Sequence, residues 1–300
     1  MADLGTKVPY NQIAAIDVAK VEASRVTKLP VGRSAYREVA SRGRAALTRA
    51  LEAAKEIEEK LDRIRNVIDE KRLSIVYQGI CNVGTRRPVG FECLARFSAA
   101  PSRTPDLWFS EAAEVGAGTL LELTAIRLAL SAFASLPAEI FLAVNASPDT
   151  ILSSDLRGAL DGLPSERIVL ELTEHAHFEN YDRLVRVLEP LRRSGVRLAV
   201  DDAGAGYSSL QHILNLRPDL IKLDMGLTRN IDLDPARRAL ASALLGFARE
   251  TGSRIIAEGV ELASELATLR ALGVELAQGY FLGPPMPLDS LAELFDQRVG

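Results

Sequence analysis

Short apolar runs of strand length recur through the chain after residue 73, and helix-like segments separate most of them. The strands predicted from these runs are 74–82, 89–97, 140–147, 167–173, 196–202, 219–224, 254–260 and 276–282. Helices are predicted at 109–116, 120–135, 150–160, 180–194, 207–216, 235–251, 262–272 and 288–297. This alternation predicts an α/β fold in which helices surround a single closed barrel. Only residues 83–88 separate the first two strands, too few for a crossover helix, so one strand is expected to run antiparallel.

An acid, an amide or a lysine stands at the end of most of the predicted strands. These residues are Glu92, Asn145, Glu171, Asp201, Asp202, Lys222, Glu258 and Gln278. A parallel barrel brings the carboxyl ends of its strands to one face, where barrels of this type hold their active sites. A single acid at a strand end is usually a turn or cap residue. The joint placement of five carboxylates, two amides and one lysine at one mouth is different, because so much like charge is unstable without cations, and it predicts a metal site.

The chemistry of such a site follows from its ligand atoms. Oxygen ligands favour hard cations such as Mg²⁺ or Mn²⁺. One ligand shell could be formed by Glu92, Asn145, Glu171 and Asp201. Asp202 and Glu258 could complete a second shell, and two cations about 3.5–4 Å apart are the usual arrangement for in-line cleavage of a phosphate ester. Lys222 could orient the attacking water. Because adjacent strand residues point to opposite faces, the chain must turn after Asp201 for both aspartates to reach the mouth.

The region before the barrel carries an apolar stripe with alternating spacings of three and four residues. The stripe consists of Leu47, Ala50, Ala54, Ile57, Leu61, Ile64 and Ile68. It lasts about three heptads, near the lower limit for a coiled coil. Two interpretations stay open: an amphipathic helix packed on the barrel, or a dimerising or signal-transmitting helix over 47–68. We therefore divide the chain into an N-terminal helical or linker segment, 1–70, and a barrel domain, 71–300.

Composition narrows the classes of partner. The 300 residues are 47% hydrophobic and 25% charged, which is typical of a globular protein. A net charge of −4 without a basic block suggests neither a nucleic-acid polymer nor an anionic membrane surface as a partner. The uncharged apolar stretches are too short to span a bilayer, and the amino terminus lacks the order of a signal peptide. The two cysteines fit a reducing compartment, so a cytoplasmic location is expected.

Short motifs follow one another in a fixed order between residues 77 and 281. They read YQGI (77–80), ECLAR (92–96), NAS (145–147), ELTE (171–174), DDAGAGYSSL (201–210), IKLD (221–224), AEGVE (257–261) and QGYF (278–281). In the same order they resemble the motifs YQPI, EALLR, NxS, ExTE, DDFGTGYSSL, IKxD, AEGVE and QGYxF of the EAL family of cyclic dimeric GMP phosphodiesterases. The resemblance covers about residues 72–290.

The resemblance implies a fold, a reaction and a role for individual residues. The implied fold is a modified TIM (β/α)8 barrel with one antiparallel strand, preceded by an N-terminal helical segment. The implied reaction is hydrolysis of cyclic di-GMP to linear pGpG with two Mg²⁺ or Mn²⁺ ions, in a homodimer. The implied metal ligands are Glu92, Asn145, Glu171, Asp201, Asp202 and Glu258, and the implied catalytic residues are Lys222, Glu258 and Glu92. The implied substrate contacts are Gln78, Leu94, Arg96 and Gln278, and Glu174 would hold the loop after the two aspartates.

Several positions depart from the family pattern. Cys93 replaces the central alanine of EAL and is expected to be tolerated, because it should point away from the mouth. Gly79 replaces a proline, which is expected to loosen a strand end. Ala203 and Ala205 replace an aromatic residue and a threonine, so slower or differently regulated catalysis is expected.

A competing hypothesis is an EAL-like receptor that binds cyclic di-GMP without hydrolysing it and relays a signal through the N-terminal helix. Degenerate members of such families usually lose metal ligands. This chain keeps every ligand position that can be matched, which favours the enzyme. It has no GGDEF-like motif, so synthesis of the dinucleotide is not expected.

Overall fold

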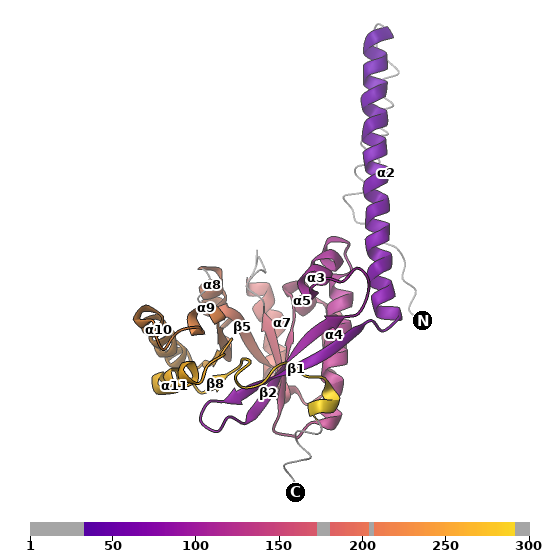
Figure 1. Cartoon of the computed structure of the whole chain (residues 1–300). Coiled ribbons are helices and arrows are strands. Elements are labelled where there is room, and N and C mark those ends of the chain that lie inside the picture. The colour runs from indigo at the N-terminus through magenta and orange to yellow at the C-terminus, as the bar shows by residue number, and fades with distance from the viewer. Residues whose placement is uncertain (1–32, 173–180, 204–206, 292–300) are drawn as a thin grey trace.

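The computed structural model describes residues 33–172, 181–203 and 207–291. Eight strands close into a barrel in the order of the chain (Figure 1). They are β1 (Leu73–Asn82), β2 (Pro88–Phe97), β3 (Phe141–Asn145), β4 (Ile168–Leu172), β5 (Arg197–Ala203), β6 (Leu220–Leu223), β7 (Arg254–Ala257) and β8 (Leu276–Ala277). Strand β1 pairs antiparallel with both β2 and β8, and the other neighbouring pairs are parallel. The predicted barrel with one antiparallel strand is confirmed.

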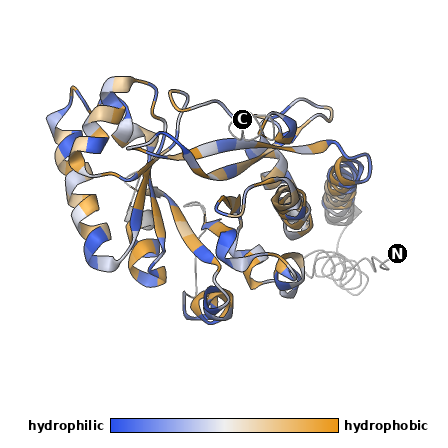
Figure 2. Cartoon of the chain, turned by 90° about the horizontal axis from the view of Figure 1, so that it is seen from below, coloured by the Kyte–Doolittle hydropathy of each residue, from blue (hydrophilic) through white to orange (hydrophobic). Residues whose placement is uncertain are grey.

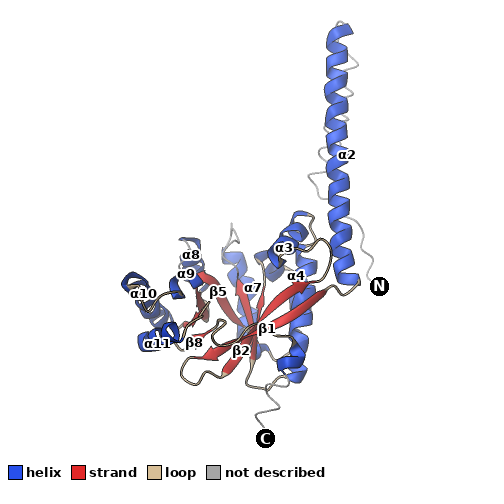
Figure 3. Ribbon diagram, in the orientation of Figure 1, coloured by secondary structure: helices blue, strands red, loops and turns tan. Residues whose placement is uncertain are grey.

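Helices surround the barrel, as the ribbon coloured by secondary structure makes clear (Figure 3). They are α3 (Pro105–Glu114), α4 (Gly118–Leu130), α5 (Pro148–Leu152), α6 (Ser154–Leu160), α7 (Tyr181–Arg193), α8 (Tyr207–Leu216), α9 (Met225–Thr228), α10 (Pro235–Thr251) and α11 (Ala263–Leu272), with 3-10 turns at Ser131–Ser135 and Ser165–Arg167. Figure 2 shows hydrophobic and hydrophilic stretches mixed along the helices around the strands, as expected for helices that are apolar on one side. Most of the helix predicted at 288–297 lies outside the described residues.

Local signals account for where the elements begin and end. The side chain of Asp234 accepts hydrogen bonds from the backbone N–H groups of Ala236 and Arg237 at the start of α10, where Pro235 fits the first turn. Gly252 ends this helix at φ 75°, a left-handed conformation that glycine adopts without steric cost. These signals place α10 at the predicted bounds 235–251. The four-residue helix α9 was not predicted, because it is too short to carry a periodic pattern.

A layer of buried apolar side chains fills the inside of the barrel. It consists of Ile80, Phe141, Ala143, Val169, Ala199, Leu220, Ile256 and Leu276. Gly90 on β2 leaves room for this layer, because a Cβ atom there would lie 2.4 Å from the ring of Phe141. Strand side chains alternate between the two faces, so the residue two positions further along a strand points into the same interior. This layer is therefore the floor on which the mouth of the barrel is built.

In the part of the chain that the structure describes, one segment, Gly118–Ser135, is long and apolar enough to cross a membrane by length and composition alone. It consists of α4 and the 3-10 turn that follows. Helix α4 packs on β1 and β3, and its buried side chains include Leu121, Ile126 and Leu130. Packing against the barrel accounts for the buried part of this segment, whereas Leu120 and Leu128 on it are exposed.

Helix α2 (Arg33–Asp69) leads into β1, and its amino-terminal part extends away from the barrel (Figure 1). Its last turns pack on the barrel, because Ile64 and Val67 are buried in a cluster with Trp108 of α3 and Leu121 of α4. Further toward the amino terminus, Leu47 is 55% exposed. The packed-helix interpretation therefore holds for the carboxyl-terminal part of the stripe, whereas the part around Leu47 lies open in a single chain.

A charged cluster supports the same junction between α2 and α3. Arg63 Nε on α2 lies 2.9 Å from Glu111 Oε1 on α3, and Arg103 pairs with the second oxygen of the same carboxylate. Lys60 Nζ lies 3.0 Å from an oxygen of Glu114 and 3.0 Å from Glu56 Oε1, so three cations meet three acids. Burial alone would raise the pKa of Glu111, but the hydrogen bonds from the two arginines outweigh it and lower this pKa below its ordinary value. The junction is a locally balanced cluster of opposite charges.

Candidate active site

The polar layer of the barrel lies directly above the apolar floor. Its members are Asn145, Glu171, Asp201, Lys222, Glu258 and Gln278, each two positions after a floor residue. Glu92 stands two positions after Gly90 on β2. The strand period of two therefore turns all of these side chains to the same side of the sheet. The sequence placed them at strand ends, and the fold brings them to one mouth.

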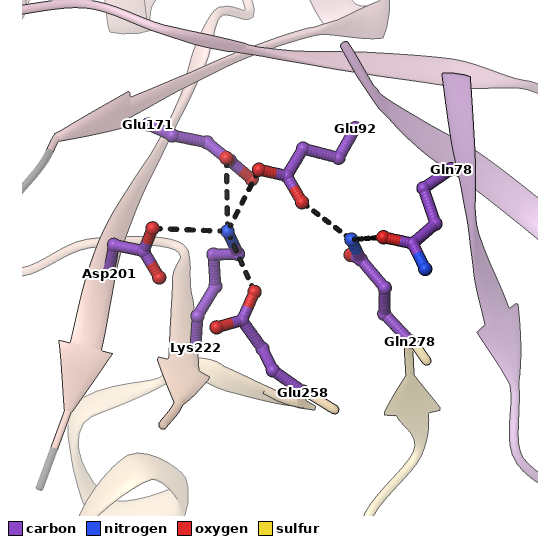
Figure 4. A network of polar contacts seen from close by, with 7 residues as sticks. All are labelled: Gln78, Glu92, Glu171, Asp201, Lys222, Glu258 and Gln278. Carbon is purple, nitrogen blue, oxygen red and sulfur yellow. Dashed lines mark hydrogen bonds and ion pairs between the residues drawn. The ribbon is translucent and has the colours of Figure 1, made fainter. Parts of the chain in front are cut away.

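The ammonium group of Lys222 lies at the centre of the acidic residues (Figure 4). Its Nζ atom is 2.8 Å from Glu258 Oε1, 3.1 Å from Glu171 Oε2, 3.2 Å from Asp201 Oδ2 and 3.5 Å from Glu92 Oε1. The lysine side chain is only 1% exposed. Four carboxylates thus share one positive charge in a buried position, which leaves an excess of negative charge at the mouth.

The pKa values in this cluster reflect that excess. Burial, followed by the nearby acids, raises the pKa of Glu171 well above its ordinary value despite the attraction of Lys222. The pKa of Glu258 is raised to about 8, mainly by burial and also by Asp201 and Glu92. Burial alone would lower the pKa of Lys222, but the surrounding carboxylates raise it well above its ordinary value. The lysine is therefore charged at neutral pH, while the carboxylates compete for too little positive charge.

A pair of glutamines holds Glu92 from the side away from Lys222. Gln278 Nε2 donates to Glu92 Oε2 at 2.5 Å and to Gln78 Oε1 at 2.9 Å (Figure 4). Gln78 Nε2 in turn donates to the carbonyl oxygen of Gly283 at 3.3 Å. Gln78 and Gln278 are both buried. The two amides fix one oxygen of Glu92 and leave the other directed at Lys222.

The donor set fits a hard divalent cation. The donor atoms gathered around Lys222 are carboxylate oxygens, and Glu171 Oε1 is buried without a hydrogen-bond partner in the described structure. An unpartnered buried carboxylate oxygen is costly unless a cation or water meets it. Within the described ranges no three acidic, cysteine or histidine side chains form a preformed metal cluster, because the acids converge on the lysine. These oxygens can bind a cation in one of two ways. Either they contact the cation and the Lys222 ammonium group at the same time, or their side chains turn away from the ammonium group.

The backbone at Asp201 and Asp202 explains how two adjacent acids can serve one mouth. Val200 pairs with Ile221 and Ala203 pairs with Leu223, so two residues of β5 oppose Lys222 alone on β6. This is a β-bulge, which interrupts the strict alternation of side chains. The bulge lies within β5, and residues 204–206, which begin the loop after the two aspartates, lie outside the described residues. The side chain of Asp202 lies outside the described residues, and so does Glu174.

The remaining predicted residues lie nearer the rim. Asn145 is half-buried on β3, and its backbone pairs with Glu171 on β4. Leu94 and Arg96 follow Glu92 on the same face of β2, and Leu94 is half-buried while Arg96 is exposed. The Arg96 guanidinium donates to the carbonyl oxygen of Ala95 at 2.8 Å and does not join the acid cluster. The fold therefore brings the acids and Lys222 together and leaves Arg96 outside them.

The residues that differ from the family pattern lie in different parts of the structure. Cys93 is buried in the apolar cluster between barrel and helices, so it points away from the mouth as predicted. Gly79 lies inside β1, paired with Phe91, so the expectation that it loosens a strand end is wrong. Ala203 is fully buried beside Ile213 and Leu223, and Ala205 lies outside the described residues.

One polar contact near the mouth was not predicted. The backbone N–H of Ser147, two residues after Asn145, donates to Glu122 Oε2 on α4 at 2.8 Å. Glu122 is an acid within a helix, and only the packing of α4 against the loop after β3 brings it there. No strand-end pattern could have identified it.

The closed barrel with one reversed strand, its surrounding helices and an acidic mouth around a single lysine together define a modified (β/α)8 barrel. The family model described as EAL domain matches residues 61–285. The chain therefore belongs to the EAL domain family.

Two relatives and two solved structures illustrate the similarity. The chain is 32% identical over 244 residues to the uncharacterized protein y4lL of Sinorhizobium fredii, covering 78% of this chain and 29% of y4lL. It is 38% identical over 144 residues to the cyclic di-GMP phosphodiesterase NbdA of Pseudomonas aeruginosa, covering 47% of this chain and 18% of NbdA. The chain thus spans less than a third of either relative.

Among the structures, the PaMucR phosphodiesterase in complex with c-di-GMP has a TM-score of 0.69 and 28% identity, covering 78% of this chain and 99% of that chain. Klebsiella pneumoniae BlrP1, in a complex with manganese and cyclic di-GMP, has a TM-score of 0.64 and 29% identity, covering 72% of this chain and 56% of BlrP1.

Proposed function

We propose that this protein hydrolyses one phosphodiester bond of cyclic di-GMP and releases linear pGpG, with two Mg²⁺ or Mn²⁺ ions at the mouth. The observation that carries the proposal is the convergence of four carboxylates on the buried Lys222. Membership of the EAL family and the similarity to NbdA, which is named a cyclic di-GMP phosphodiesterase, support the choice of substrate. The similarity to the PaMucR complex supports it independently.

The cations would be held by the oxygen ligands at the strand ends. One set comprises Glu92, Asn145, Glu171 and Asp201, and a second draws on Asp202 and Glu258. Bound divalent cations would supply a water activated for attack and would stabilise the charge that develops on the phosphate oxygens. The manganese complex of BlrP1 supports this metal class. The excess of carboxylates over ammonium groups supports it on physical grounds.

The residues of the chain have separate tasks in this proposal. Lys222 keeps its proton, because the carboxylates raise its pKa, and its Nζ can donate a hydrogen bond to the attacking water or a phosphate oxygen. Gln278 and Gln78 hold Glu92 in a fixed orientation. Arg96, exposed at the rim, carries the charge and geometry that suit a phosphate of the incoming dinucleotide. Leu94 would contact the substrate beside it.

The proposal is tested by incubating the full chain with cyclic di-GMP and either MgCl2 or MnCl2, followed by chromatographic separation of the nucleotides. Appearance of pGpG that a chelator abolishes is the expected result. Saturable binding of intact cyclic di-GMP without product would instead favour a receptor. Absence of both binding and product would overturn the proposed substrate.

A further inference from the structure

The loop that follows β3 is fixed by contacts with β4, with α4 and with the first turn of α5. The backbone N–H of Ala146 donates to the carbonyl oxygen of Glu171 at 2.9 Å, which extends the pairing of β3 with β4. The next N–H, that of Ser147, donates to the carboxylate of Glu122 at 2.8 Å. The Ser147 hydroxyl accepts a hydrogen bond from the N–H of Thr150 at 3.3 Å and caps helix α5. Three hydrogen bonds therefore hold the two residues immediately after Asn145.

The contact from Glu122 differs in kind from the other two. The first belongs to the strand ladder and the third is a local helix cap, whereas Glu122 is a charged side chain from a separate helix. A hydrogen bond from a backbone N–H to a carboxylate is shorter and stronger than one between neutral groups. Glu122 is half-buried, so solvent screens the contact only in part. Helix α4 thereby anchors the loop to the outer layer of the barrel.

Asn145 directly precedes this loop. Asn145 is the last residue of β3, and its amide is the one neutral ligand in the proposed set. A neutral amide oxygen attracts a cation less strongly than a carboxylate, so its contribution depends on correct placement. Groups that orient metal ligands from behind typically change metal affinity by about 10- to 100-fold when removed.

We propose that Glu122 is a positioning residue that orients Asn145 toward the divalent cation. The inference rests on the proposed function, because it requires Asn145 to be a ligand. Glu122 touches neither substrate nor cation in this proposal. It acts through the backbone of Ser147 and the two residues that precede it.

The test measures Mn²⁺ binding to the full chain by titration calorimetry without substrate, and the Mn²⁺ dependence of hydrolysis separately. Glu122→Ala is expected to weaken Mn²⁺ binding about tenfold. Glu122→Gln retains an acceptor oxygen at the same distance from the helix and is expected to restore binding to within about threefold of the wild type. At saturating Mn²⁺, turnover by Glu122→Ala should recover, because the variant loses affinity and not chemistry.

Two further variants separate positioning from charge and from general stability. Glu139→Ala removes the same charge from an exposed site before β3, and it should leave Mn²⁺ binding unchanged. Combining Glu122→Ala with Asn145→Ala should weaken binding no more than Asn145→Ala alone, because the two residues act as one unit. If Glu122→Ala does not fold, Glu122→Asp keeps the charge but is one methylene too short, and it should show the same loss.

Each failure has its own meaning. Wild-type affinity in Glu122→Ala, or additive losses in the double variant, would overturn the role of Glu122. A loss of Mn²⁺ affinity of similar size in Glu139→Ala would mean that removal of any nearby negative charge produces the effect. That result would also overturn the positioning role of Glu122. A wild-type chain that neither binds Mn²⁺ nor hydrolyses cyclic di-GMP would refute the proposed function instead.

Discussion

The junction of α2 with the barrel and the mouth of the barrel both bury charged side chains, and they balance the charge differently. At the junction of α2 with the barrel, Glu111 is paired with two arginines, and its pKa is lowered below the ordinary value. At the mouth, four carboxylates share Lys222, and the pKa values of Glu171 and Glu258 are raised. Balanced charge stabilises a junction, whereas unbalanced charge costs folding free energy that a bound cation can offset.

The largest expected effect of changing the charge at the mouth is on the rate of hydrolysis. Glu92→Gln keeps the size of the side chain and removes one carboxylate charge from the mouth. We expect hydrolysis of cyclic di-GMP to fall by about 100-fold or more, because an amide cannot replace a carboxylate ligand beside Lys222. The measurement is the initial rate at saturating MnCl2. The urea midpoint serves as the control and should not fall, since the substitution relieves repulsion. Near-normal turnover would contradict the assignment of Glu92 as a ligand.

Removal of the single positive charge at the mouth should cost stability in a metal-dependent way. Lys222→Met leaves the carboxylates without their ammonium partner, so we expect a loss of about 3 kcal/mol in unfolding free energy with a chelator at pH 8. Millimolar MgCl2 should restore part of that loss, because cations can replace the missing charge. Urea unfolding of wild type and variant in both buffers measures the difference. An equal loss with and without Mg²⁺ would argue against a cation site.

The period of two along the strands explains why so much of the mouth was predictable. Glu92, Glu171 and Glu258 each follow an apolar run, and a closed barrel leaves such positions only one face to share. The central place of Lys222 was not predictable, because it depends on side-chain conformations that no spacing encodes. Glu122 was missed for a similar reason, since tertiary packing alone brings α4 to the loop after β3.

The extent of α2 could be predicted only in part. The stripe predicted a helix over 47–68, and the structure extends it from Arg33 to Asp69. The spacing suggested one continuous seam, yet Ile64 is buried against the barrel while Leu47 is exposed. A heptad pattern gives the side of a helix that is apolar, but not the partner that covers it.

The contribution of the balanced junction to the unfolding free energy should depend on pH in the opposite sense to that of a cluster of acids with raised pKa values. Glu111→Gln is expected to lower the unfolding free energy by about 2 kcal/mol at pH 7, because both arginines lose their charged partner. The pKa of Glu111 is below its ordinary value of 4.5 in the folded protein. Its ionised form therefore stabilises the fold above that pH, and the stabilisation is lost as the pH falls through the folded-state pKa.

Urea unfolding from pH 7 to pH 3.5 should thus show the two proteins converging at the acid end. Glu114→Gln on the same helix is the matched control, because Glu114 is exposed, and it should cost less than about 0.5 kcal/mol. Activity should be unchanged in both variants. A pH-independent difference for Glu111→Gln would assign the loss to packing instead of charge.

The smallest expected effect separates the two parts of α2. Leu47→Ser should change the unfolding free energy of a single chain by less than about 0.5 kcal/mol, because Leu47 is 55% exposed. Ile64→Ala, its buried counterpart, should cost about 3 kcal/mol through lost burial and a cavity. Thermal unfolding at several protein concentrations measures both. A midpoint that rises with concentration, and that Leu47→Ser lowers, would mean that a second copy covers this part of the helix. The exposed leucine would then belong to the homodimer that the sequence predicts, and the stripe would serve two partners along one helix.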